Sequence, residues 1–269
     1  MKNVTHRPAF FAETEILAGP HAVAEALRAG RRSVRRVWLA RQERGGIGEV
    51  IQGLARDRGV PVEVRPRVDL DRLVKGATHQ GVLAEVGPFP YATAEDVVAR
   101  ALARPGAGFL LVLDGIQDPQ NLGAIVRSAE AAGVDGILLP KDRAAGMSPG
   151  AVRASAGAAE HLPVARITNV AAFLDHVRSQ GFWIVGTDAA AGRDLFASDL
   201  TSPLALVVGG EDRGLRPLTK SRCDLIVRIP LGGRVSSLNA SAAAAVCLFE
   251  VARQRGAQAR QGSDPGSRS

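Results

Sequence analysis

The chain has 269 residues, of which 46% are apolar and only 4% aromatic, so it can form one large domain or two ordinary ones around an aliphatic core. A count of 34 Lys and Arg against 27 Asp and Glu gives a formal net charge of +7, which favours a polyanionic partner without identifying one. The only cysteines, Cys223 and Cys247, lack a CxxC partner, which excludes a disulfide framework and a cysteine zinc site.

Residues 1–14 carry charge but no apolar segment, so we expect a flexible arm rather than a signal peptide. No apolar run approaches the ~18 residues of a membrane span, and we expect a reducing cytoplasm and no membrane partner. Alternating helical and strand patterns then predict a small α/β domain over residues 15–87. Its expected helices cover residues 21–29, 47–59 and 68–74, and its expected strands cover 34–39, 60–64 and 81–86.

Residues 88–108 are rich in Pro and Gly around one short helical pattern and are expected to connect two domains. The second unit, residues 109–254, alternates apolar runs with helical patterns, which predicts a mainly parallel sheet covered on both faces. Its expected strands are residues 109–113, 136–139, 182–186, 204–208 and 225–229, and its expected helices are 121–132, 170–180 and 237–253. Residues 255–269 lack apolar periodicity and are expected to be a disordered tail.

Three segments of the second unit have the same sequence pattern: residues 114–127, 209–215 and 229–239. Each begins at the end of an apolar run and continues into a loop rich in Gly, Asn, Ser or a carboxylate. Parallel strands deliver such loops to one edge of a sheet, where ligands bind. The three loops are therefore expected to build one site.

Each segment also has a simpler interpretation when it is taken alone. Asn121 and Arg127 can be a capping residue and a solvated helix residue. The strand that ends in Gly209-Gly210-Glu211 allows close backbone approach to a ligand, but it is neither a phosphate loop nor GxGxxG. Ser237 and Asn239 can be helix N-caps.

Taken together and in order, the three segments resemble the motifs of the SpoU (TrmH-like) family of RNA ribose 2′-O-methyltransferases. The resemblance implies a deep trefoil knot, S-adenosylmethionine as cofactor, a homodimer and no metal. By motif position it assigns methyl-donor binding to Gly209, Ile229 and Leu238. It assigns catalysis to Arg127, Asn121, Glu211, Ser237 and Asn239. Because a guanidinium stays protonated in ordinary sites, we expect Arg127 to orient the ribose hydroxyl rather than accept its proton.

The first unit resembles, at residues 16–23 and 78–85, the L30e/L7Ae-like RNA-binding domain of bacterial 23S rRNA guanosine 2′-O-methyltransferases. This implies methylation of a guanosine ribose in large-subunit rRNA. Between these ends lies a basic, Trp-containing stretch that can bind phosphates and stack a base. The expected RNA contacts are Arg31, Arg32, Arg35, Arg36, Trp38, Arg41 and His79. The alternative is that Trp38 belongs to the core and the arginines form a solvated face.

The sequence leaves three other functions open. The same chemistry on tRNA is disfavoured by the front domain. An inactive RNA-binding or ribosome-assembly protein of this fold, or an enzyme that modifies a different rRNA site, would keep the motifs for another purpose. An unrelated α/β protein would need three ordered motifs by chance.

Overall fold

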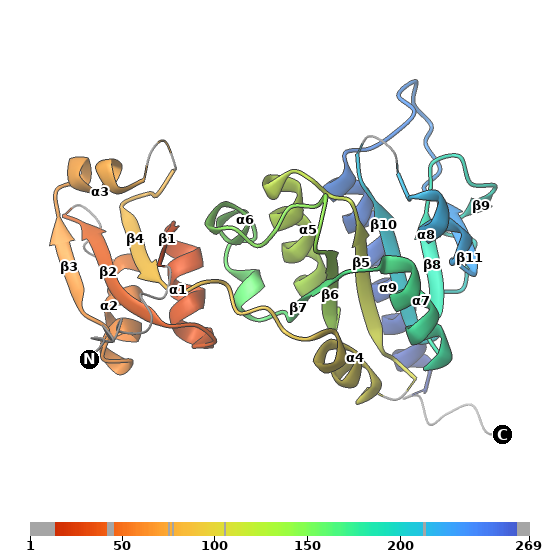
Figure 1. Cartoon of the computed structure of the whole chain (residues 1–269), viewed down its shortest axis with the longest axis horizontal. Coiled ribbons are helices and arrows are strands. Elements are labelled where there is room, and N and C mark those ends of the chain that lie inside the picture. Colours follow the sequence, from red (N-terminus) through yellow and green to blue (C-terminus); the bar gives the residue numbers. More distant parts are fainter. Residues whose placement is uncertain are drawn as a thin grey trace, which may run out of the picture. The chain divides into compact units, whose positions relative to one another are not determined.

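The computed structural model describes residues 14–41, 46–74, 76, 78–104, 106–211 and 214–262, with the side chains of 259–262 outside the description. The chain divides into two compact units after Pro90 (Figure 1). Residues 1–13 of the predicted arm and residues 263–269 of the predicted tail lie outside the described residues.

The first unit is a four-stranded sheet with strand order β1-β4-β2-β3 and three helices. Strand β4 is antiparallel to β1 and β2, whereas β3 is parallel to β2. The elements are β1 (Glu15–Ala18), α1 (Pro20–Ala29), β2 (Val34–Ala40), α2 (Ile47–Asp57), β3 (Val62–Arg65), α3 (Arg67–Leu73) and β4 (Val82–Val86). Helix α1 starts with Pro20, whose missing N–H costs nothing there, and ends at Gly30 in the left-handed conformation. The helices and strands expected in this unit are all present.

The second unit contains a seven-stranded sheet with strand order β7-β6-β5-β10-β8-β11-β9, and each of its pairings is parallel. The predicted mainly parallel sheet is therefore confirmed. The strands are β5 (Phe109–Asp114), β6 (Gly136–Pro140), β7 (Val164–Ile167), β8 (Trp183–Thr187), β9 (Arg193–Asp194), β10 (Leu204–Gly209) and β11 (Leu225–Arg228). The helices are α4 (Ala94–Leu102), α5 (Pro119–Ala131), α6 (Pro149–Ala154), the 3-10 turn η1 (Ala158–Glu160), α7 (Val170–Ser179), α8 (Pro217–Ser221) and α9 (Ala240–Gly262).

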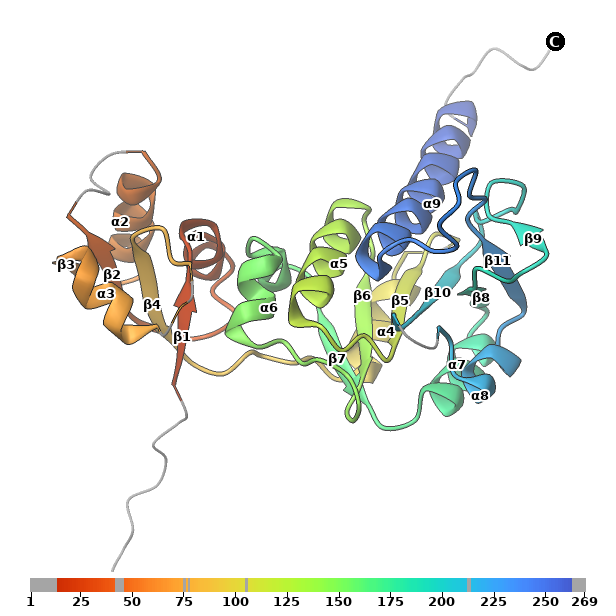
Figure 2. The same ribbon diagram turned by 90° about the horizontal axis from the view of Figure 1, so that it is seen from above.

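Helices cover both faces of this sheet, as Figure 2 shows for α9 on one side and α7 on the other. The central strands are accordingly rich in apolar residues, and all six residues of β5 are buried. Strand order reverses between β5 and β10, because the chain first runs outward through β6 and β7 and then returns to β8. In open parallel sheets such a reversal leaves a crevice at the carboxyl ends of the strands, which is where ligands bind.

Two boundaries differ from the sequence expectation. The helix within the expected connection, α4, buries Val97, Val98 and Ala101 in the core of the second unit, so residues from Tyr91 onward belong to that unit. Helix α9 continues to Gly262 instead of ending before a disordered tail. Its extension is anchored by Arg255, whose guanidinium donates to the carbonyls of Ala107 and Ser202 at 2.6 and 2.7 Å.

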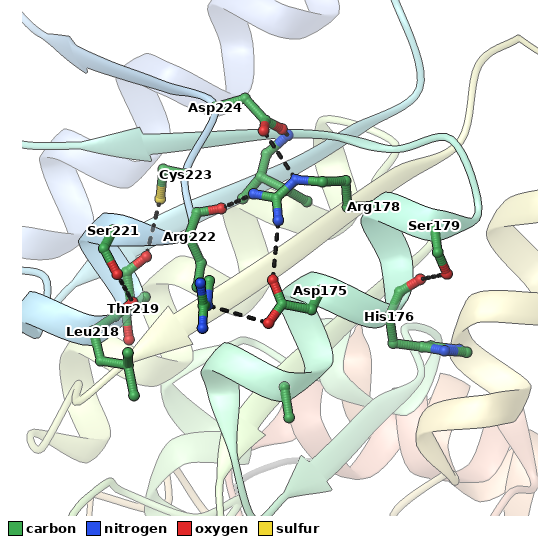
Figure 3. Close-up of polar contacts among 12 residues, drawn as sticks. Asp175, His176, Arg178, Ser179, Leu218, Thr219, Ser221, Arg222, Cys223 and Asp224 are labelled. Atoms are coloured by element: carbon green, nitrogen blue, oxygen red, sulfur yellow. Dashed lines mark hydrogen bonds and ion pairs between the residues drawn. The ribbon is translucent and has the colours of Figure 1, made fainter.

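A polar network fixes the amino ends of β8 and β11, opposite the crevice (Figure 3). Arg178 Nε and Nη1 donate to Asp224 and Asp175 at 2.9 and 3.0 Å, and Arg222 Nε lies 3.1 Å from Asp175. Asp224 in turn accepts from the backbone N–H of Ile184 at 2.9 Å. Two guanidinium groups face two carboxylates here, so their charges compensate each other. Because Asp224 also binds the backbone of β8, the cluster ties α7 and α8 to the sheet.

Candidate active site

A cavity of about 320 Å³ opens at the carboxyl ends of β8, β10 and β11, beside the start of α9. Its volume suits a ligand of small-molecule size. The wall combines glycine backbone, apolar side chains and a few polar groups. It consists of Thr187, Asp188, Ala189, Val208, Gly209, Gly210, Glu211, Gly214, Val227, Arg228, Ile229, Leu231, Ser237, Leu238, Ala240 and Ala243.

Residues assigned to the cofactor from the sequence meet in this wall although they come from two distant loops. Gly209 ends β10, while Ile229 and Leu238 lie in the loop between β11 and α9. Glu211 and Ser237, two of the expected catalytic residues, line the same cavity.

Glycine is required where the loop after β10 approaches other backbone. A Cβ at Gly209 would lie 2.2 Å from the carbonyl carbon of Gly214, and a Cβ at Gly210 would lie 2.4 Å from the carbonyl oxygen of Gly115. These approaches involve backbone atoms, which cannot move aside as a flexible side chain would. The two glycines thus let the loop close on the sheet edge while exposing backbone to the cavity.

A chain of hydrogen bonds links one residue from each of the three sequence segments. Asn239 donates from Nδ2 to Oδ1 of Asn121 at 3.1 Å, and Asn121 donates from Nδ2 to Oε1 of Glu211 at 2.6 Å. The two contacts span 118 and 90 residues of sequence. The sequence motifs therefore form one polar cluster at the mouth of the cavity.

Helix caps hold the two asparagines in place. Asp118 caps α5 by accepting from the N–H groups of Gln120 and Asn121, at 3.1 and 3.2 Å. Asn239 precedes α9, and its Oδ1 accepts from the N–H of Ser241 at 2.9 Å. The capping role considered for Asn239 is thus real, and it leaves Nδ2 available for Asn121.

Arg127 is not brought to this cluster within one chain. It lies six residues after Asn121 on α5, or about 240° around the helix. Its side chain is exposed, it is absent from the cavity wall, and it forms no hydrogen bond or ion pair with another described residue.

Asp188 is a wall residue that the sequence interpretation missed. It directly follows β8, and its carboxylate pairs with the ammonium group of Lys220. The Lys220 hydrogen bond, and then a 2.8 Å bond from the N–H of Ala190, hold the pKa of Asp188 below its usual range. A charged residue just after an apolar strand is the signal that could have identified it.

Four of the expected RNA contacts in the first unit are at least partly accessible to solvent. Arg41 and Arg35 are exposed and Arg31 and Arg36 half-buried. Arg36 pairs with both Glu63 and Glu85 at 3.1 Å.

The other three positions need correction as direct contacts. Trp38 is 6% exposed and packs with Leu70 and Leu83, so its ring cannot stack on a base. His79 is 3% exposed; its Nε2 lies 2.7 Å from Asp71, and its Nδ1 accepts from the N–H of Gly81. Arg32 is also buried, with its guanidinium 3.6 Å from Glu15.

Within the part of the chain that the structure describes, no group of three or more His, Cys, Asp or Glu side chains could hold a metal ion. No described helix has the length and apolarity needed to cross a membrane.

Family models match both units. The model of the SpoU rRNA Methylase family matches residues 108–249, and the model for RNA 2′-O ribose methyltransferase substrate binding matches residues 16–92. The 23S rRNA (guanosine-2′-O-)-methyltransferase RlmB of Pseudomonas aeruginosa is 42% identical over 242 residues, which is 90% of this chain and 97% of that protein. YacO of Bacillus subtilis, whose name leaves tRNA and rRNA open, is 41% identical over 90% of this chain and 96% of its own length.

Solved structures agree with these matches. The SpoU methyltransferase AviRb of Streptomyces viridochromogenes, in complex with AdoMet, superposes with a TM-score of 0.75 and 28% identity, covering 91% of each chain. A TrmH/SpoU tRNA modifying enzyme of A. aeolicus gives a TM-score of 0.53 at 26% identity and covers 62% of this chain and 87% of its own. The chain therefore belongs to the SpoU rRNA methylase family and is an RNA ribose 2′-O-methyltransferase.

Proposed function

We propose that the protein transfers a methyl group from S-adenosylmethionine to the ribose 2′-hydroxyl of a guanosine in large-subunit rRNA. The observation that carries this proposal is the meeting of the three segments at one edge of the sheet. There the Asn239–Asn121–Glu211 chain borders a cavity that accepts a small molecule. The RlmB relatives, which match 90% of this chain, support rRNA over tRNA.

S-adenosylmethionine is the cofactor, and the cavity residues fit it. Backbone at Gly209, Gly210 and Gly214 provides hydrogen-bonding groups without side chains in the way. Apolar side chains such as Val208, Ile229 and Leu238 can cover an adenine ring and a thioether carbon chain. When bound, the sulfonium supplies an electrophilic methyl group.

The chain's own contribution is to hold the attacking hydroxyl in line and to stabilise the charge that develops on it. A ribose hydroxyl is a weak nucleophile, so its proton leaves as the new bond forms. In our proposal, Asn121 and Glu211 orient the ribose, and Ser237 and Asn239 hold the loop that borders it. Arg127 binds the hydroxyl oxygen and an adjacent phosphate, and the proton passes to that phosphate or to water.

This mechanism needs Arg127 at a site that its own chain does not bring it to, and a homodimer would supply it from the partner. In support, Arg127 is exposed on α5, which packs against α9. Phe249 on α9 is 51% exposed, so it is available for contact with a partner subunit.

The same family assignment leads to three further proposals, on the knot, on the role of the first domain and on the location of the protein. We propose that the loops after β10 and β11 form the trefoil knot of the family. We also propose that residues 15–87 are an L30e/L7Ae-like domain that binds the substrate RNA, with the connection to the second unit confined to residues 88–90. The proposed location is the cytoplasm, where ribosomes are assembled.

The test is methyl transfer from labelled S-adenosylmethionine to protein-free large-subunit rRNA and, separately, to bulk tRNA, with the product nucleoside identified by mass spectrometry. 2′-O-methylguanosine in rRNA alone is expected. Label in tRNA alone would contradict the proposed substrate while keeping the enzyme class. Donor binding without label in either RNA would contradict activity on free rRNA and point to an assembling ribosomal subunit or to a binding role.

A further inference from the structure

One residue outside the cavity, Asp114, holds both ends of the loop that carries Glu211. Asp114 ends β5 and is the register partner of Gly209 at the end of β10. Its backbone carbonyl accepts from the N–H of Gly210 at 3.1 Å, and its Oδ2 accepts from the N–H of Arg216 at 3.0 Å. The loop from 209 to 216 therefore begins and ends on the same residue.

The carboxylate of Asp114 is paired with the residue that it captures. Its side chain is fully buried, and Oδ1 lies 3.4 Å from Nε of Arg216, whose side chain is 42% exposed. Among the described residues, Oδ1 accepts no hydrogen bond. A buried carboxylate is costly unless a charge compensates it, so the Arg216 guanidinium is the group that makes this anion tolerable.

The described residues of this loop, 209–211 and 214–216, are held by further contacts. Gly214 donates from its N–H to the carbonyl of Gly210 at 3.0 Å, and Leu215 is buried in the core of the second unit. The close backbone approaches at Gly209 and Gly210 leave no room for the loop to shift toward the sheet. A substitution of Asp114 or Arg216 should therefore displace the loop residues that line the cavity.

We propose that Asp114 and Arg216 are positioning residues that set the affinity for the methyl donor by fixing the 209–216 loop. Neither residue lines the cavity, whereas Gly209, Gly210, Glu211 and Gly214 of that loop do. The inference rests on the assignment of the cavity as the donor site.

The chain contains a matched control at the opposite end of the same strand. Asp135 is also buried, accepts from a backbone N–H (Phe109, at 2.8 Å) and pairs with an exposed arginine (Arg104, at 2.9 Å). This second pair lies at the amino end of β5, away from the cavity. Loss of either buried pair should destabilise the fold, but only the Asp114 pair should change donor binding.

The experiment compares Asp114→Asn, Arg216→Met, Arg216→Lys and Asp135→Asn with the wild type in the full-length protein. S-adenosylmethionine affinity is measured by calorimetry, steady-state kinetics separate KM for the donor from kcat, and Tm reports stability. We expect Asp114→Asn and Arg216→Met to weaken donor binding about 10-fold or more, as expected for loss of a charged hydrogen-bonded contact. Their kcat at saturating donor should fall less than their KM rises. Arg216→Lys, which keeps the charge, should recover part of the affinity, and Asp135→Asn should lower Tm with unchanged affinity.

Unchanged donor affinity in Asp114→Asn and Arg216→Met, with a Tm lowered as in Asp135→Asn, would overturn the proposal and leave only a structural ion pair. Absence of donor binding by the wild type would overturn both this inference and the cavity assignment. A wild type that binds the donor but does not methylate rRNA would remove the proposed substrate alone, and the affinity difference between the variants would still support the positioning role.

Discussion

Asn121 donates from Nδ2 to Oε1 of Glu211 over 2.6 Å, and its own Oδ1 accepts from Nδ2 of Asn239. The amide of Asn121 therefore joins a carboxylate on one side to an amide donor on the other. Only a side chain that both donates and accepts can hold this position. Because Nδ2 of Asn121 faces Glu211 and its Oδ1 faces Asn239, the two bonds also fix the orientation of the Asn121 amide.

Replacing Asn121 by Asp should abolish this arrangement without changing the side chain's shape. The new carboxylate would face Glu211, and the two anions would repel each other in place of a bond worth about 1.5–3 kcal/mol. We expect methyl transfer to fall at least ~10- to 100-fold in kcat/KM, the factor to which such a loss converts. Single-turnover kinetics with saturating donor provide the measurement.

Asn169→Asp is the matched control, because Asn169 caps α7 by accepting from the N–H of Ala172, a role that Asp fills equally well. It should retain full activity. Equal rates for both variants would show that the contact between Asn121 and Glu211 is irrelevant to turnover.

A methyl group at Gly209 should disable the cavity. Gly209→Ala places Cβ 2.2 Å from the carbonyl carbon of Gly214, so backbone must shift in the loop that carries Glu211. Donor binding measured by calorimetry should become undetectable or much weaker. Gly232→Ala, in the loop after β11, meets nothing within 4 Å and should bind the donor normally. Normal binding by Gly209→Ala would mean that the loop is not part of the donor site.

Apolar patterns predicted the strands near the site because β5 and β10 are buried on both faces and three of the four residues of β11 are at least half-buried. Strands β5, β10 and β11 fall within one residue of their expected bounds. Polar residues that follow a buried strand were informative for the same reason, since they have no role in the core. Glu211 and Asn121 were identified in this way, together with the family motifs.

Other features depend on packing that no local pattern encodes. Strand β7 has only four residues and α6 only six, too few to establish a period. Helix α9 continues past Arg253 because Arg255 binds carbonyls of distant loops, a tertiary effect absent from the local sequence. Trp38 lies within a basic stretch, but the last four residues of β2 are all buried and its ring packs with Leu70 and Leu83, so neighbouring charges were a poor guide to its exposure.

Arg127 provides a test of the proposed dimer. Arg127→Ala should lose turnover and keep donor affinity, since Arg127 does not line the cavity of its own chain. Arg127→Lys should fail to restore the rate if planar, bidentate contact with the hydroxyl and phosphate is needed. Calorimetry and methyl transfer on the same preparations provide the two readouts.

Mixing subunits separates the partner's contribution from the chain's own. A heterodimer of an Arg127→Ala subunit and an Asn121→Asp subunit should regain one intact site, provided that Arg127 acts across the interface. Activity no higher than that of either variant alone would contradict the exchange of Arg127 between subunits. Full turnover by Arg127→Ala itself would remove the residue from the mechanism.

The buried thiol of Cys247 should make stability fall in alkaline solution. Burial raises its pKa from an ordinary 9.0 to about 12, and the side chain is 1% exposed. Between these values the unfolded chain loses the proton and the folded chain keeps it. The stabilising contribution is therefore complete below pH 9 and declines by about 1.4 kcal/mol per pH unit as the pH rises toward 12. Urea unfolding at a series of pH values should show a slope to which Cys223 also contributes, since burial raises its pKa to about 12 as well, and Cys247→Ala should reduce that slope by about 1.4 kcal/mol per pH unit. An identical slope in the variant would show that Cys247 ionises equally in both states. Such a result would contradict the burial of its thiol.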